Sequence, residues 1–538
     1  MKSETIESED KADSDMDYCP MDSDHESPVV YNSSPNLSRM KKNEEAASSL
    51  RVTAVQILVT LGASLSMLSP GMALGFSAVA LPQLTVEGIP NKIDPFNENI
   101  ASWFASISNI ATPVGCLLSA WTLERVGRKF TLVLLNVPCM VGWVFLATSN
   151  TLWGLFVGRI CTGLAIGLAS AVTNVYLAEV VKPAMRGFLI CWNSISIALG
   201  ILIVYILGSA LPWRYAAWAG AVPALLAFVA AIIMPDSPSW LLSRSKASQA
   251  ERSLIALRGG GGAAVRAEFE ELVRAQEQRA KGPKAGWRNL SRSFRKPEFW
   301  KPLLILNVFF AFQQFSGIYV VIFYAVDVVQ EAGVTMDKYL ATVFIGVARL
   351  IATGGVSIAM RRYGRRPMGI ISGVGMTFCM VLLGAHLYFT EGMTPTPLSW
   401  WPAVAVIGYI FTSTIGFLTL PWVMVGEVFP SELRGVGGGL TTCFAYLIGF
   451  AVLKAYPGMQ HMLNAYGVFL VYGIVSFLAT IFVIIWLPET HGKTLAQVEE
   501  YFAGPARRQN NSPPVMALSK PLLVMSAPVK DADKDQIA

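Results

Sequence analysis

The sequence predicts an all-α membrane protein in which twelve transmembrane helices form two six-helix bundles. Three observations support this fold class. Of the 538 residues, 53% are hydrophobic and only 14% are charged, which leaves too little polar surface to cover a soluble protein of this size. Apolar segments of membrane-spanning length follow one another along most of the chain, and short motifs of the first half recur in the second half.

The apolar segments fall into two groups of six. Each segment is long enough to cross about 30 Å of hydrocarbon as a helix. The first group covers 52–80, 100–122, 130–149, 151–178, 187–210 and 214–234. The second group covers 302–326, 338–360, 368–390, 400–426, 436–456 and 466–487. We therefore expect an N-terminal bundle (51–234), a cytoplasmic loop with intracellular helices (235–301) and a C-terminal bundle (302–490).

Polar tails flank the two bundles. Residues 1–50 are rich in Asp, Glu, Ser and Asn and have few aromatic side chains. They cannot bury enough apolar surface to offset chain entropy, so a disordered tail is predicted. Residues 491–538 form a second polar tail. Lys and Arg gather in the links on the same side as the middle loop, and this excess of basic residues predicts that both tails are cytoplasmic.

The net charge and the cysteines exclude several function classes. The formal charge is +6, but the basic residues lie between apolar segments rather than on one helix face, so no nucleic-acid partner is predicted. The seven cysteines occur singly, mostly inside apolar segments, and are interpreted as packing residues. The sequence shows no metal-ligand cluster, nucleotide-binding loop or nucleophile motif. It therefore predicts no enzyme activity, no cofactor and no metal site.

Three motifs recur in the two halves in the same order. A basic turn follows the second span of each half, a Glu and an Arg follow the fourth, and a proline with an acid follows the sixth. The pairs are Gly127-Arg128-Lys129 with Gly364-Arg365-Arg366, Glu179 to Gly187 with Glu427 to Gly435, and Pro235-Asp236 with Pro488-Glu489. This pattern is typical of membrane proteins built from two duplicated halves.

Four motifs resemble the signatures of the sugar-porter family of the major facilitator superfamily, which includes facilitative glucose transporters and insect facilitated trehalose transporters. The motifs are Gly127-Arg128-Lys129, Pro235 to Trp240, Gln313 to Ile318 and Pro488 to Gly492. The resemblance implies the major facilitator fold with a central solute site. It also implies facilitated diffusion of a sugar (a hexose or a trehalose-like disaccharide) or a similar polyol by alternating access, in the plasma membrane.

The repeated charges are predicted to act as a gate on the cytoplasmic side. Glu179 and Glu427 end long spans at the headgroup boundary, where ion pairs are screened less than in bulk water. The predicted gating residues are Arg128, Glu179, Arg186, Arg365, Glu427 and Arg434. The alternative is that the basic residues only orient the spans. Arg361 stands where the resembled family usually has an acid, so one favourable pair fewer is expected in the second half.

Polar and aromatic residues inside the spans are the candidate solute ligands, because polar side chains are costly in lipid and normally face a cavity or another helix. The amides of Gln313 and Gln314 offer donors and acceptors to sugar hydroxyls, with hydrogen bonding between helices as the alternative. Trp422 follows Pro421 and matches the tryptophan that stacks on the sugar in the resembled family. Aromatic packing is the alternative for this residue.

Several positions depart from the family pattern. Tyr319 replaces an Asn and Arg349 replaces an amide near the middle of a span, so both are predicted to belong to an altered solute site. The other departures are Ser194 in place of a Gln and Ala445-Tyr446 in place of Asn-Trp. Asp327, or backbone carbonyls at a helix break, are the alternative partners of Arg349. Ser77 stands near the acid of proton-coupled relatives, which argues against proton symport.

Three functions remain open on the sequence. The first is facilitated passage of a sugar or polyol, and Arg349 favours a second, the transport of an anionic or other non-sugar solute. The acidic, Ser-rich N-terminal tail favours a third, a transporter-like nutrient sensor. His386 could titrate near neutral pH, with a histidine that faces a neighbouring helix as the alternative. The expected partners are a small-molecule solute and membrane lipid.

Overall fold

The computed structural model describes residues 35–88, 93–281, 294, 296–334, 336–360, 362–390, 400–430, 433–493 and 495–503. Within these ranges the chain is helical and has no strand, as the sequence predicts. The chain divides into two units at Arg51 and Val52. Helix α1 (Pro35–Val86) begins in the first unit and continues in the second, so it starts before the predicted span. Residues 1–34 of the predicted tail lie outside the described residues.

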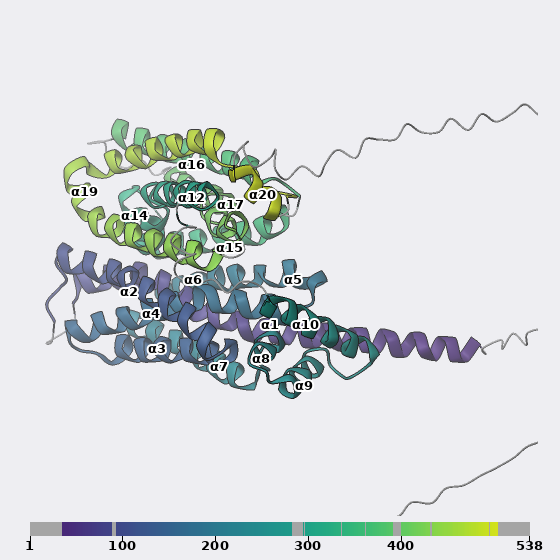
Figure 1. The fold of residues 1–538 in the computed structure, drawn as a ribbon. Coiled ribbons are helices and arrows are strands. Elements are labelled where there is room, and N and C mark those ends of the chain that lie inside the picture. Colours follow the sequence, from purple (N-terminus) through teal and green to yellow (C-terminus); the bar gives the residue numbers. More distant parts are fainter. Residues whose placement is uncertain are drawn as a thin grey trace, which may run out of the picture. The chain divides into compact units, whose positions relative to one another are not determined.

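The first half contains six spans where the sequence places them (Figure 1). After α1 come α2 (Glu98–Arg125), α3 (Arg128–Thr148), α4 (Leu152–Val180), α5 (Pro183–Leu189), α6 (Cys191–Ala210) and α7 (Trp213–Ile233). The short helix α5 meets α6 at Ile190, and together they form the fifth span. Local capping explains where helices begin: the side chains of Asn97 and Thr151 accept the hydrogen bonds of free main-chain N–H groups at the starts of α2 and α4.

The middle segment folds into short helices, α8 (Pro238–Ser243), α9 (Ala247–Leu257) and α10 (Ala263–Lys281). These helices lie in the segment (235–301) where the sequence analysis expects intracellular helices. Arg258 connects this segment to the first half. Its guanidinium pairs with Glu268 of α10 at 2.6 Å. It also donates a 3.0 Å hydrogen bond to the carbonyl oxygen of Val180 at the end of α4. The middle segment is therefore held against the predicted cytoplasmic end of the first half.

The second half follows the same plan with more interruptions (Figure 1). Its helices are α12 (Pro297–Phe315), α13 (Ile318–Phe323), α14 (Ala325–Glu331), α15 (Lys338–Ala359), α16 (Arg365–Thr390), α17 (Trp401–Ile415), α18 (Leu420–Val428), α19 (Arg434–Trp486) and α20 (Leu495–Ala503). The seventh span consists of α12, α13 and α14, and the tenth consists of α17 and α18. The described part of the predicted C-terminal tail consists of 491–493 and α20.

The described residues include ten helices that are long and apolar enough to cross a membrane. α19 supplies two spans, because Asn464 has a non-helical backbone (φ 54, ψ 173) that interrupts it. The seventh span, which is divided among the three consecutive helices α12, α13 and α14, is outside that count. With these two additions the predicted twelve-span arrangement is confirmed.

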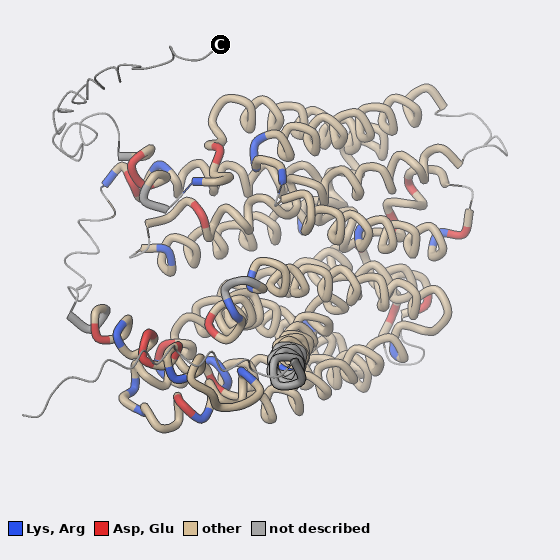
Figure 2. Tube along the Cα trace, turned by 90° about the vertical axis from the view of Figure 1, so that its right-hand side faces the viewer, with Lys and Arg blue, Asp and Glu red and all other residues tan. Residues whose placement is uncertain are grey.

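Small residues and the position of the charges fit a membrane environment. A Cβ on Gly163 or Gly167 of α4 would overlap main-chain atoms of α2, so these glycines allow the two helices to pack backbone against backbone. In Figure 2 the long helices carry few charged bands along their length, while Lys, Arg, Asp and Glu gather mainly toward helix ends and on the short helices of the middle segment. The few charged residues inside the bundles therefore require a specific explanation.

Candidate functional site

Two spans of the second half are broken inside the bundle. The break between α12 and α13 is at Gly317, which has φ 88, and the ring of Tyr472 lies so close that no side chain would fit there. The break between α17 and α18 covers 416–419 and directly precedes Leu420-Pro421. Backbone groups freed at such breaks need protein partners, because lipid offers none.

Side chains of each broken span donate hydrogen bonds to main-chain carbonyl oxygens at the break in the other span. Nε2 of Gln313 donates to the carbonyl oxygens of Phe417 (2.7 Å) and Leu418 (3.1 Å). In the opposite direction, the hydroxyl of Tyr409 on α17 donates to the carbonyl oxygen of Ser316 (2.6 Å). The amide nitrogen of Gln313 thus joins two helices, which is the alternative that the sequence left open for this residue.

The amide oxygens of both predicted glutamines are free. Oε1 of Gln313 and Oε1 of Gln314 are buried and accept no hydrogen bond within the described residues. Three helices meet at Gln314: a Cβ on Gly449 of α19 would lie 3.0 Å from its Oε1 and 3.0 Å from Nδ2 of Asn109 on α2. The two oxygens can therefore accept hydrogen bonds from the hydroxyls of a solute. Asn109 was not singled out from the sequence.

Trp422 lies among aromatic residues from three other helices. Its ring centre is 4.8 Å from that of Phe310 and 5.7 Å from that of Tyr446, and the Tyr319 hydroxyl interacts with its indole. Trp422 is partly buried, whereas Tyr319 and Tyr446 are each 8% exposed. The structure therefore brings the predicted ligands Tyr319 and Trp422 together, with Tyr446 beside them.

Arg349 lies midway along α15 and is 7% exposed. Its Nε and NH1 atoms are buried and donate no hydrogen bond within the described residues. The groups that act on it electrostatically are the hydroxyls of Tyr319 and Tyr205. Asp327, the alternative partner named from the sequence, interacts with Lys338 instead. Tyr205 of α6 belongs to the first half, so Arg349 lies close to the junction of the halves.

Arg159 of α4 is a buried arginine that the sequence analysis did not single out. It is fully buried, and its guanidinium donates to the carbonyl oxygens of Ala73 (2.9 Å) and Phe104 (3.2 Å) and to the hydroxyls of Ser77 (2.8 Å) and Ser108 (3.1 Å). A lone arginine inside an apolar segment was the available signal. Ser77, where an acid was considered, is therefore one of its hydrogen-bond acceptors.

The charged residues at the predicted cytoplasmic end of the first half form a closed network. NH2 of Arg128 lies 2.7 Å from Oε1 of Glu179, and NH1 of Arg128 donates to the Leu123 carbonyl oxygen. The hydroxyl of Ser237 donates to the same carboxylate. Asp236 accepts from the main-chain N–H of Lys129 at the start of α3 (3.3 Å).

The second half repeats this network with different residues. NH2 of Arg365 lies 2.7 Å from Oε1 of Glu427, and Thr490 donates its hydroxyl to Oε2 of Glu427 (2.6 Å). Glu489 accepts from the main-chain N–H groups of Arg365 (2.9 Å) and Arg366 (3.0 Å). The repeat read from the sequence is therefore a repeat of contacts, to which Ser237 and Thr490 add a hydroxyl that was not foreseen.

The remaining predicted gating residues have free donors. Nε of Arg186, and Nε and NH2 of Arg434, are buried and make no hydrogen bond within the described residues. Each Arg–Glu pair lies inside one half, and the described residues show no ion pair between the two networks. Arg361, expected to weaken the second network, lies outside the described residues.

At the opposite end the two halves are joined by polar contacts. Nζ of Lys454 on α19 donates to Oδ1 of Asn99 (2.6 Å) and to the hydroxyl of Ser102 (2.8 Å) on α2. Nε2 of His461 on α19 lies 2.5 Å from Oε2 of Glu98, the first residue of α2. These contacts close the end that lies away from the charge networks.

Two other positions named from the sequence are Ser194 and His386. Ser194 of α6 is exposed. The ring centre of His386 on α16 is 5.4 Å from that of Trp401 on α17, nearly edge to face. This contact agrees with the alternative of a histidine that faces a neighbouring helix.

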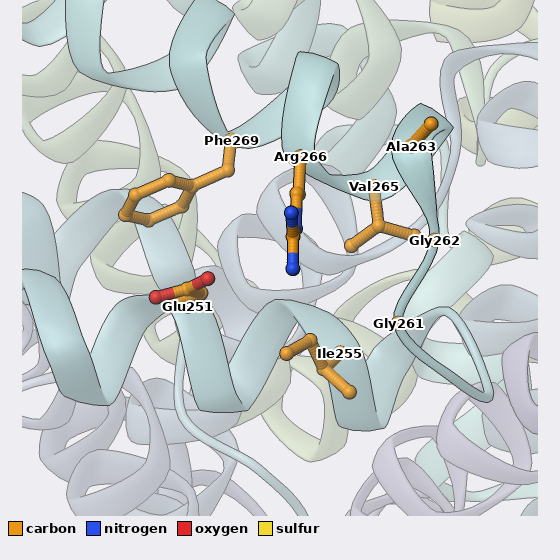
Figure 3. Close-up of a pocket in the computed structure, with 8 residues that line it drawn as sticks. All are labelled: Glu251, Ile255, Gly261, Gly262, Ala263, Val265, Arg266 and Phe269. Carbon is orange, nitrogen blue, oxygen red and sulfur yellow. The ribbon is translucent and has the colours of Figure 1, made fainter.

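A cavity of about 440 Å³ lies between α9 and α10 (Figure 3). Glu251 and Ile255 of α9 face Val265, Arg266 and Phe269 of α10 across it. None of the residues predicted to bind solute lines this cavity. Within the described ranges no group of three His, Cys, Asp or Glu side chains could hold a metal ion.

Comparisons with known proteins agree with this architecture. The family model described as "Sugar (and other) transporter" matches residues 53–502. The facilitated trehalose transporter Tret1 of Apis mellifera ligustica is 31% identical over 465 residues, which cover 86% of this chain and 91% of that protein. Solute carrier family 2, facilitated glucose transporter member 8 of Mus musculus is 32% identical over 465 residues, covering 83% and 94%.

Solved structures show the same fold. The major facilitator proton:xylose symporter XylE, bound to 6-bromo-6-deoxy-D-glucose, superposes with a TM-score of 0.67 at 25% sequence identity. The superposition covers 84% of this chain and 99% of that one. The similarity therefore includes both halves and is not confined to the repeated motifs.

Proposed function

The chain belongs to the sugar (and other) transporter family, and we propose that it moves a sugar or a similar polyol across a membrane by facilitated diffusion with alternating access. One observation carries the proposal: Gln313 and Gln314 hold free amide oxygens inside the bundle, in the same half as the aromatic group around Trp422. Hydroxyl groups can donate to these oxygens while the apolar face of a sugar ring lies on an aromatic ring. The relatives named for trehalose and for glucose support this class of solute.

In the proposed cycle, the described state is open toward the cytoplasm. Lys454 and His461 join the halves at the far end, while the two Arg–Glu pairs each remain within one half. The far contacts separate when the site opens outward. Arg186 and Arg434, whose buried donors are free, then donate to acceptors on the cytoplasmic end of the other half. In the described state, the pairs Arg128–Glu179 and Arg365–Glu427 stabilise the cytoplasmic end of each half.

Transport is proposed to be independent of a proton gradient. The Ser77 hydroxyl accepts from Arg159, and the other hydrogen-bond acceptors of Arg159 in the described chain are carbonyl and hydroxyl oxygens. A serine hydroxyl does not titrate near neutral pH, so this position has no group that loads and releases a proton. The proposed location is the plasma membrane with both termini in the cytosol, as the basic links favour.

Uptake by the full chain in cells that lack endogenous sugar transport tests the proposal. The probes are labelled D-glucose, trehalose and D-sorbitol, each measured with and without a proton uncoupler. We expect saturable uptake of at least one probe that the uncoupler does not reduce and that the same solute on the opposite side accelerates. Chain present at the cell surface without saturable uptake of any sugar or polyol would refute the proposal. Saturable binding without flux would favour a sensor.

A further inference from the structure

Two arginines are buried among the described spans, one in each half, and their donors are used differently. The guanidinium of Arg159 donates to two carbonyl oxygens and two hydroxyls at 2.8–3.2 Å. The guanidinium of Arg349 has two buried nitrogens, Nε and NH1, that donate to nothing within the described residues. Arg159 is therefore satisfied by the fold, whereas Arg349 has donors available to a bound molecule.

No described side chain neutralises Arg349. It lies near the middle of α15, too far from either end for its side chain to reach the headgroups. It makes no ion pair with Asp327, which interacts with Lys338. Its electrostatic neighbours, Tyr319 and Tyr205, are phenols that are neutral at physiological pH. A cation kept unpaired in a span is costly, so we expect its counter-charge to arrive with the solute.

The guanidinium is placed at the junction of the halves, beside the proposed polyol site. Gly346 lies on the same face of α15 one turn earlier, and a Cβ there would be 3.2 Å from the ring of Tyr205 of α6. On the other side, Tyr319 interacts both with Arg349 and with the indole of Trp422. Trp422 in turn contacts Phe310, which lies about one turn before Gln313 and Gln314 on α12. A chain of contacts therefore connects the free donors of Arg349 with the helix that carries the free acceptors.

We propose that the transported sugar carries one carboxylate, as a hexuronate or an aldonate does, and that Arg349 binds this carboxylate. The inference rests on the proposed function, because the sugar hydroxyls are assigned to Gln313 and Gln314. A guanidinium matches a carboxylate in charge and in hydrogen-bonding geometry. The amide oxygens can only accept, so they suit the hydroxyl-bearing end of the same molecule.

The number of charges favours a carboxylate over a phosphate. Arg349 brings one guanidinium with free donors to Tyr319 and Tyr205, whereas the donors of Arg159 are already used by the fold. A phosphomonoester carries about −1.5 to −2 at neutral pH and would leave negative charge unbalanced in the spans. A hexuronate carries a single negative charge, which one guanidinium balances.

Transport by the purified full chain in proteoliposomes tests the proposal. The probes are labelled D-glucuronate and D-glucose, with D-gluconate, D-sorbitol, glucose 6-phosphate and L-lactate as unlabelled competitors. The variants are Arg349→Gln, which removes the charge, and Arg349→Lys, which keeps it. Arg214→Gln is the matched control, because Arg214 bonds to Ser149 and Asn150 at the end of the first half that lies away from the charge networks, and not at mid-span. A potassium gradient with valinomycin sets the membrane potential.

We expect the wild-type chain to carry glucuronate with a lower KM than glucose, and gluconate to compete better than sorbitol. A potential that is positive inside should accelerate glucuronate entry and leave glucose entry unchanged. Arg349→Gln should raise the glucuronate KM about tenfold or more, as loss of a charge-assisted pair implies, while Arg349→Lys retains part of the affinity. Arg214→Gln should resemble the wild type.

The outcomes separate the two proposals, and the wild-type competition needs no variant to fold. Saturable glucose uptake that glucuronate and gluconate do not inhibit overturns the carboxylate inference and leaves the proposed function standing. Competition by lactate but by neither sugar acid, with no glucose uptake, overturns both. Stronger competition by glucose 6-phosphate than by glucuronate overturns the choice of a carboxylate.

Discussion

The Tyr409 hydroxyl donates a 2.6 Å hydrogen bond to the main-chain carbonyl oxygen of Ser316, at the point where the seventh span is broken. Gln313, on the same broken span, donates in return to the carbonyl oxygens exposed by the break in the tenth span. The two breaks therefore stabilise each other without water, which the membrane interior lacks. Any movement of one break during transport must involve the other.

Tyr409→Phe should destabilise the second half, because the buried carbonyl oxygen of Ser316 loses its donor while the ring remains. The expected cost is about 1–3 kcal/mol, seen as a lower melting temperature of the purified protein in detergent. Tyr388→Phe is the matched control, since Tyr388 is 56% exposed and its hydroxyl has no such role. Equal melting temperatures for Tyr409→Phe and the wild type would show that the bond is dispensable.

The neighbouring glutamines should respond differently to alanine. Gln314→Ala removes a free acceptor, so sugar uptake should fall about tenfold or more at constant melting temperature. Gln313→Ala also strands the carbonyl oxygens of Phe417 and Leu418, so melting temperature and surface abundance should fall as well. Uptake kinetics and melting temperatures of both variants test this difference. Wild-type uptake in Gln314→Ala would place the solute elsewhere.

Glu427→Gln should slow turnover more than it weakens solute binding. The substitution removes the charge that pairs with Arg365 but leaves the solute region untouched, so the effect should appear in one conformation of the cycle. We expect the maximal uptake rate to fall several-fold while KM changes by less than about twofold. Glu270→Gln is the control, because its pair with Arg274 on α10 is exposed. Parallel changes in rate and KM would contradict this role.

Acidification should weaken the cytoplasmic end of the second half through Glu489. Burial raises the pKa of this carboxyl, but hydrogen bonds from the main-chain N–H groups of His491, Arg365 and Arg366, with the charge of Arg365, outweigh burial and lower it. A carboxyl whose pKa is lower in the folded state stabilises the fold above its ordinary pKa. This contribution is lost as the pH falls through the folded-state value.

The difference in melting temperature between the wild type and Glu489→Gln should therefore be largest near about pH 7 and shrink toward about pH 4. A melting series at constant ionic strength measures it, with Glu270→Gln as the exposed control. A difference that stays constant over this range would mean that the charge of Glu489 does not contribute.

The fold could be predicted because its signals are local and repeated. Apolar segments of spanning length end at polar or basic residues, and α15 and α16 match their predicted segments closely. The duplicated motifs predicted which contacts would recur. The motifs also repeat a hydroxyl residue that was not singled out: Ser237 follows Asp236, and Thr490 follows Glu489. The Ser237 hydroxyl donates to Glu179 and the Thr490 hydroxyl donates to Glu427.

The arrangement of the candidate site could be predicted only in part. Hydropathy marks Gln313 as a polar residue in a span, but whether its nitrogen or its oxygen is free depends on which carbonyls the neighbouring break exposes. Arg159 and Arg349 look equivalent in the sequence, since each is an arginine inside an apolar segment. Only the packing of α1 and α2 around Arg159 supplies the acceptors that Arg349 lacks.

Because each charge network lies within one half, the first network can form before the second half is synthesised. Arg128, Glu179 and Ser237 are all translated before the second half begins, and Arg258 already binds the end of α4. The nascent first half can therefore complete its cytoplasmic scaffold while the ribosome is still making the rest, as domains generally fold in order of synthesis. Two polypeptides separated within the middle segment after α10 should likewise assemble when co-expressed, held by the contacts of α2 with α19.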